Sequence, residues 1–186
     1  MKTYTVIILL SIAMGCSSSH NNAKVDTTAL MHKIKDLKRK YHLIDFAIDT
    51  KRIYGAGDVS TLTRTIVDKT LPEKEITVSE ALSRDGKFYI ATLVNDDITF
   101  QMHTHTDKDR ISSELMTILY DIPVVFNSDK RYYMVNPAIG LTGKDAWYFC
   151  GTEKDLREAR EEGLPLIFPD ENPTETPEYK LYSDNL

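Results

Sequence analysis

Apolar residues recur at helical spacing near the start of the chain, in the segment between Asp26 and Tyr41. Leu30, Ile34, Leu37 and Tyr41 follow one another at intervals of four, three and four positions, which places them on one side of an α-helix. Asp26 stands where an N-cap is expected. This pattern predicts an amphipathic helix that lies across a sheet.

Three further segments are also expected to be helical. A short, threonine-rich helix over residues 60–69 follows a turn at residues 55–58. A second helix begins after a capping-box-like stretch at residues 106–109, carries its apolar stripe from Ile111, and should end at Pro123. A third, highly charged helix opens at Thr152 and stops before Gly163.

Strict alternation of apolar and polar residues predicts strands, most clearly between residues 75 and 105. Three alternating runs, 76–82, 87–94 and 98–105, are separated by turn residues such as Asp85-Gly86 and Asn95-Asp96. Runs of this length with such turns are typical of an antiparallel meander.

Further strands are expected elsewhere, and together the elements indicate the fold class. Residues 44–48 alternate, residues 124–126 and 131–135 are expected to form a hairpin around 127–130, and short strands are expected at 147–150 and 166–168. Helices interspersed among antiparallel strands, without a regular βαβ repeat, indicate an α+β fold: two layers, a mostly antiparallel sheet with helices packed on one face. The predicted domain covers residues 26–169, followed by an acidic, proline-containing tail at 170–186.

The first sixteen residues have the order of a signal peptide. Lys2 precedes an apolar run from Val6 to Met14, which is followed by the small residue Gly15 and by Cys16. The run is about half of the ~20 residues that a helix needs to cross a bilayer, so it is read as a cleaved signal rather than a permanent anchor.

The tetrad Ala13-Met14-Gly15-Cys16 resembles the lipobox of bacterial lipoproteins. The resemblance implies that residues 1–15 are removed, that Cys16 is the lipid attachment site, with palmitate among the expected acyl groups, and that residues 16–25 form a flexible tether. Ser17 follows the cysteine where a retention signal would have Asp, so the resemblance implies the outer membrane. The residues after Cys16 lack the acidic pattern that some bacteria use for surface export, which favours the periplasmic face. The alternative is an ordinary secretory signal with an incidental cysteine.

Composition narrows the choice of partners. The chain has 23 basic and 28 acidic residues, a formal net charge of −5, and no basic patch with interleaved aromatic residues, so nucleic acid is not an expected partner. With Cys16 assigned to lipid, Cys150 has no intramolecular partner and is expected to be a buried, unreactive thiol. The aromatic group Tyr132, Tyr133, Trp147 and Tyr148 is read as core, with a binding surface as the alternative.

One group of residues could carry metal chemistry: His103, His105 and Asp107. On a strand, His103 and His105 point to the same face, so both imidazoles could bind one zinc ion, with Asp107 as a third ligand. The competing interpretation is a polar sheet face followed by a helix whose first turn is capped by Thr106, Asp107 and Asp109.

No sequence-local catalytic signature is present: the chain has no Gly-x-Ser-x-Gly elbow, no phosphate-binding loop and no Ser-x-x-Lys motif. Gly55-Ala56-Gly57 resembles the start of a dinucleotide fingerprint but is read as a turn. The leading hypothesis is therefore a lipid-anchored, non-enzymatic protein-binding module without a cofactor, such as an immunity protein that blocks a toxin. The alternatives are a metal-binding lipoprotein or metal-dependent hydrolase that uses His103 and His105, and a structural envelope lipoprotein.

Overall fold

The computed structural model describes residues 27–49, 55–107, 113–141, 145–169 and 171–172. Cys16, the expected site of lipid attachment, lies outside these residues, as do the rest of the tetrad that resembles a lipobox, the expected tether and most of the acidic tail. In chain order the elements are α1 (Thr27–Lys40), β1 (Ile44–Ile48), α2 (Asp58–Thr70), β2 (Thr77–Leu82), β3 (Phe88–Val94), β4 (Thr99–His105), α3 (Ser113–Val125), β5 (Lys130–Val135), the 3₁₀ turn η1 (Pro137–Ile139), β6 (Ala146–Thr152), α4 (Glu153–Glu161) and β7 (Leu166–Ile167).

Strands from both ends of the chain form a four-stranded antiparallel sheet with the order β1-β6-β5-β7. β1 pairs with β6 so that Ile44 lies opposite Cys150, and β5 pairs with β7 so that Val135 lies opposite Leu166. The sheet therefore joins segments that lie far apart in the sequence.

The segment 77–105 forms a separate three-stranded sheet with the order β2-β3-β4. Both pairings are antiparallel, with Ala91 of the central strand between Glu80 and Met102. The meander predicted from alternation is confirmed: each strand begins one residue later than predicted and ends at the predicted residue.

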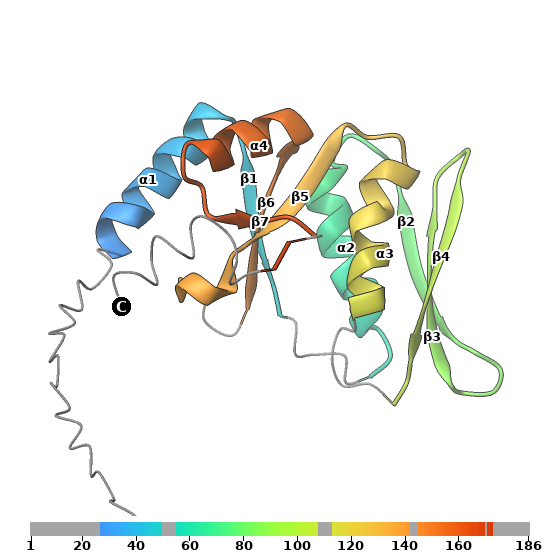
Figure 1. Ribbon diagram of the computed structural model, residues 1–186. Helices are drawn as coiled ribbons and strands as arrows, with labels where there is room; N and C mark the ends of the chain where they lie inside the picture. Colours follow the sequence, from blue (N-terminus) through green and yellow to red (C-terminus); the bar gives the residue numbers. More distant parts are fainter. Residues whose placement is uncertain (1–26, 50–54, 108–112, 142–144, 170, 173–186) are drawn as a thin grey trace, which may run out of the picture.

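Helices cover both faces of the four-stranded sheet (Figure 1). α1 and α4 pack on one face, where Ile34 and Leu156 share a core with Phe149. α2 and α3 pack on the other face and lie between the two sheets, where Ile66 and Leu119 share a second core with residues of both. The α+β class with antiparallel sheets is confirmed. The arrangement has more layers than the two expected, because neighbouring strand residues such as Tyr132 and Tyr133 are both buried, one on each face.

The end of α3 differs from the sequence-based prediction. The helix continues through Pro123 to Val125, so residues 124–126 are not a strand, and β5 pairs with β6 and β7 instead. Asn127 has a φ of 53°, its N–H donates to the Val124 carbonyl, and the N–H of Ser128 donates to the Pro123 carbonyl. This pair of bonds is the Schellman arrangement that ends many helices.

A carboxylate from β2 caps the first turn of α2. The backbone N–H groups of Gly57 and Ser60 donate to the two carboxylate oxygens of Glu80, at 2.7 and 2.8 Å. Gly57 has a φ of 94°, a conformation that glycine adopts without strain. Residues 55–57 are therefore a turn, as expected, and the positive end of the helix dipole already has an anionic partner.

No helix among the described residues is both long enough and apolar enough to cross a membrane.

Candidate functional site

One face of the three-stranded sheet is turned away from α2 and α3 (Figure 1). The strand register divides the side chains: Val78, Ala91 and Met102 point toward the helices and are buried. The alternate residues form the opposite side, here called the outer face. Its members are Thr77, Ser79, Ala81, Phe88, Ile90, Thr92, Val94, Thr99, Gln101, His103 and His105, all of them half-buried or exposed.

The outer face has no carboxylate, ammonium or guanidinium group. This is unusual for the surface of a chain in which 27% of all residues are charged, because charged side chains concentrate on protein surfaces. The turns at its two ends carry charges, with Arg84 and Asp85 between β2 and β3, and Asp96 and Asp97 between β3 and β4. An uncharged centre with a charged rim is the composition that distinguishes protein–protein interfaces.

His103 and His105 both lie on this face and both are exposed, as the alternation predicted. The ring of Phe88 contacts them from the neighbouring strand, with its centroid 4.4 Å from that of His105 and 6.3 Å from that of His103. Asp107 lies exposed in the turn after β4. Across the described residues, no three His, Cys, Asp or Glu side chains come together in a group that could hold a metal ion.

The helix cap predicted at residues 106–109 is described only at Thr106 and Asp107. Thr106 donates from its hydroxyl to the Gly86 carbonyl and from its N–H to the Lys87 carbonyl, which ties the end of β4 to the β2–β3 turn. Asp109 lies outside the described residues, as does the segment that leads into α3, so the rest of the predicted helix cap is not described.

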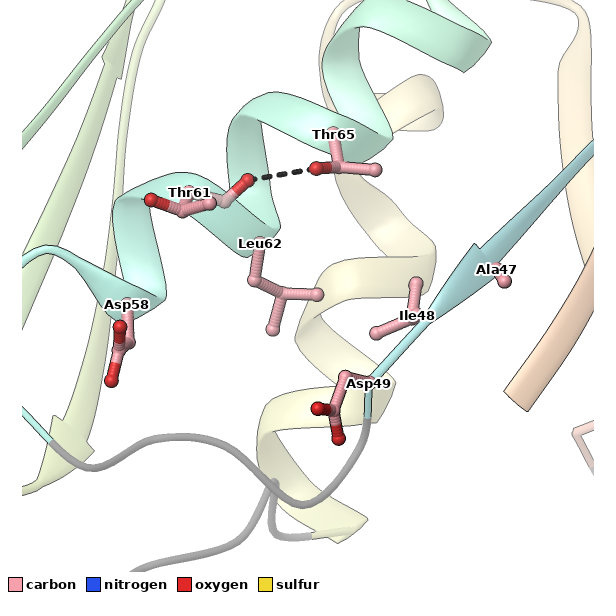
Figure 2. A pocket seen from close by; sticks show the side chains of 7 residues that line it. All are labelled: Ala47, Ile48, Asp49, Asp58, Thr61, Leu62 and Thr65. Carbon is pink, nitrogen blue, oxygen red and sulfur yellow. Dashed lines mark hydrogen bonds between the residues drawn. The ribbon is translucent and has the colours of Figure 1, made fainter. Parts of the chain in front are cut away.

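A pocket of about 250 Å³ lies between the end of β1 and the first half of α2 (Figure 2). Ile48 and Leu62 form its apolar wall, while Asp49, Asp58 and the hydroxyls of two threonines provide oxygen atoms; its lining is Ala47, Ile48, Asp49, Asp58, Thr61, Leu62 and Thr65. Asp58 accepts a hydrogen bond from the Gly55 N–H, and Thr65 donates to the Thr61 carbonyl. Asp58 and Thr65 thus hold the local backbone of the first turns of α2.

The tyrosine-rich segment is core rather than surface. Tyr132 and Tyr148 are each about 1% exposed, and their rings stand 5.6 Å apart in an edge-on arrangement next to Phe46. Burial raises the pKa of the nearby Tyr120 to about 12. The expectation of core packing is therefore confirmed for Tyr132, Tyr133 and Tyr148, which are not available to a partner, whereas Trp147 is half-buried.

Cys150 is a free thiol that lies buried in the same core, as predicted. Burial raises the pKa of its thiol to about 12. A thiol with such a pKa carries almost no thiolate near neutral pH, and the thiolate is the nucleophilic form. Cys150 therefore serves as a small apolar side chain.

Alternation in the sequence placed His103 and His105 together on a polar sheet face, but it did not combine the three strands into one surface. The signal was present in the alternation of the three runs, because register places Thr92 between Ser79 and Gln101. Compared with known proteins, the chain has no significant match to a family model, a curated protein or a solved structure. The functional assignment accordingly rests on the residues of the site.

Proposed function

We propose that the chain is a membrane-anchored lipoprotein whose domain binds another protein, without catalysing a reaction, through the outer face of the three-stranded sheet. The observation that carries the proposal is the uncharged composition of that face between charged turns. Its side chains vary from Phe88 and Ile90, which supply apolar contact, to Thr92 and Gln101, which donate and accept hydrogen bonds. A partner that covers this face does not bury any unpaired charged side chain of it.

The form of the proposal that we favour is an immunity protein, held at the periplasmic face of the outer membrane, that blocks a toxin. An inhibitor of this kind needs a rigid docking surface and an anchor rather than a catalytic group. The outer face belongs to three strands paired along their length, and the anchor is the expected lipid on Cys16. The order of residues 1–16 supports the anchor.

The docking surface is tested with a photo-crosslinking residue placed at Thr92, in the middle of the central strand, in cells that make the protein. The expected result is a discrete adduct with a second protein. The same residue at Lys35, which is exposed on α1 at the far side of the molecule, should give no such adduct. A Thr92 variant that forms no adduct, or the same adducts as Lys35, contradicts the proposal.

A charge placed on the face gives an independent test. Ile90→Lys should abolish the adduct and, for an immunity protein, protection against the toxin, because docking would bury an unpaired ammonium group. Ala138→Lys adds the same charge at an exposed position of η1 and should leave both unchanged. Equal effects of the two variants would contradict docking through the outer face.

The anchor is tested by metabolic labelling with palmitate. The natural chain should incorporate the label and fractionate with the outer membrane, whereas Cys16→Ser should do neither. Labelling that persists in Cys16→Ser would contradict lipidation at this residue.

A further inference from the structure

The two histidines of the outer face match, in residue type and number, half of the ligands of a tetrahedral zinc site. His103 and His105 lie two residues apart on β4, point to the same side and are exposed. Zinc in proteins favours four ligands in a tetrahedral arrangement, with imidazole nitrogen among the commonest. Within the described residues no third acidic, cysteine or histidine side chain joins the pair, so the described part of the chain leaves two of these four ligands to be supplied.

The surroundings of the pair favour another protein surface over solvent as the source of those ligands. Phe88 and Ile90 lie on the strand beside the histidines, opposite His105 and His103 in the register, and they make one side of the pair apolar. A zinc ion held here would sit at the edge of a face that excludes water once a partner covers it. Exclusion of water strengthens the interaction between the ion and its ligands.

A second copy of the same chain supplies the missing ligands in the correct number and type. A two-fold axis that passes beside β4 brings the pair of one copy opposite the pair of the other, because two-fold interfaces use the same surface on both subunits. Two imidazoles from each copy then complete the tetrahedral set. The charge distribution agrees: each copy has a formal net charge of −5, so two copies repel each other over most of their surface, but the outer face carries no acidic group.

We propose that a zinc ion joins two copies of the chain through His103 and His105 of each, with their outer faces in contact. This inference rests on the proposed function, since it places a second copy of the chain on the same docking surface, which a toxin could then reach only after the dimer separates. The divalent cation offsets part of the repulsion between two acidic subunits. The uncharged face provides the contact area between the two copies, and the metal fixes how they align. Neither is sufficient for a tight dimer without the other.

The experiment measures the mass of the chain in solution by sedimentation, using residues 17–186, which contain every described element. The expected result is a monomer in the presence of a chelator and a dimer with zinc, with one metal ion for two chains. Substituting Co²⁺ for Zn²⁺ should produce the visible absorption of a tetrahedral nitrogen site in the dimer.

Single variants distinguish the contribution of the two histidines to the dimer from that of the rest of the outer face. His103→Ala and His105→Ala should each leave the chain monomeric at zinc concentrations that dimerise the natural sequence, with at least a tenfold loss in zinc affinity. The matched control is His32→Ala, which removes an exposed histidine from α1 and should dimerise as before. Thr92→Lys, which keeps both imidazoles, should weaken the zinc-dependent dimer by placing like charges in the interface.

A chain that stays monomeric with zinc, that binds one zinc ion per monomer, or that dimerises equally well in both histidine variants would overturn the proposal. The Thr92 crosslinking experiment tests the proposed function independently of the dimer. An adduct with a different protein, together with a zinc-independent monomer, would reject the metal-joined dimer and leave the docking surface in place.

Discussion

The indole Nε1 of Trp147 donates a hydrogen bond to the Asp45 carboxylate, with 3.2 Å between nitrogen and Oδ2. The two residues belong to adjacent strands, β6 and β1, and Lys38 of α1 forms an ion pair with the other carboxylate oxygen. Burial by itself raises the pKa of Asp45, but the hydrogen bonds from Lys38 and Trp147 outweigh it and hold that pKa below its ordinary value. Asp45 thus links the first helix to the edge of the four-stranded sheet.

This link predicts an acid transition that Trp147 reports. A carboxyl group whose pKa is lower in the folded state stabilises the fold above its unfolded pKa of about 3.9, and that stabilisation is lost as the pH falls through the folded pKa. Trp147 is the single tryptophan of the chain, so its fluorescence should change with a midpoint below pH ~3.9. Asp45→Asn should abolish this step while leaving the circular dichroism at pH 7 unchanged. A midpoint at or above the ordinary value would contradict the assignment.

Loss of the Glu80 carboxylate should destabilise the first turn of α2. Glu80→Ala leaves two backbone N–H groups without their acceptors, and we expect a loss of about 1–2 kcal/mol in the free energy of unfolding, as for other helix caps. Glu80→Gln retains one side-chain oxygen as an acceptor and should lose less. Urea unfolding followed by circular dichroism measures both; equal losses would argue against capping as the cause.

Substitution of Tyr132 should change the free energy of unfolding in the opposite direction. Its hydroxyl is buried and has no hydrogen-bond partner among the described residues, whereas the Tyr148 hydroxyl is bonded to Tyr120. Removing an unpaired buried hydroxyl relieves a desolvation cost, so Tyr132→Phe should raise the free energy of unfolding by about 1 kcal/mol. Tyr148→Phe removes a bonded hydroxyl and should lower it by a similar amount. Destabilisation by Tyr132→Phe would show that its hydroxyl has a partner.

Cys150 should resist thiol reagents in the folded protein. Burial keeps reagents away from the sulfur and raises the pKa of its thiol to about 12. At pH 8 a reagent therefore rarely reaches the sulfur, and only a very small fraction of the thiol is thiolate. In a Cys16→Ser background, we expect alkylation of Cys150 to be at least ~100-fold slower in buffer than in urea. Mass spectrometry measures the rates. Comparable rates in the two solvents would contradict the buried position.

Local patterns in the sequence were sufficient to predict most elements. The helical spacing of Leu30, Ile34 and Leu37 placed α1 correctly, and Thr152 caps α4 by accepting from the Asp155 N–H, as its position suggested. The meander followed from alternation and turn residues alone. Such features depend on neighbours in the chain, so a single sequence contains them.

The errors arose where a local signal competed with a longer-range one. Pro123 was expected to end α3, but its missing N–H costs only one bond near the end of the helix, and the actual stop is Asn127 in the left-handed conformation. The β-branched Val124 and Val125 then resembled a strand. Nothing in the local sequence shows that the partners of β5 are β6 and β7, or that helices cover both faces of their sheet.

The candidate site was predicted only in part. The two histidines were found, and so was their exposed face, because both follow from period-two alternation on one strand. The uncharged outer face was not found, because it requires the register of three strands to be known together. Cys16, the best-supported residue of the sequence reading, lies outside the described residues, so its lipidation stays a prediction.

The pairing of β1 with β6, which places Ile44 opposite Cys150, also limits when the four-stranded sheet can form during synthesis. Among the described strands β1 leaves the ribosome first, but β6, its neighbour in the sheet, follows about a hundred residues later. A nascent chain that ends before residue 146 can close the meander at 77–105 but leaves the backbone of β1 without a partner strand. The four-stranded sheet therefore cannot form until β6 and β7 have been synthesised, a sequence of events compatible with the export that residues 1–16 predict.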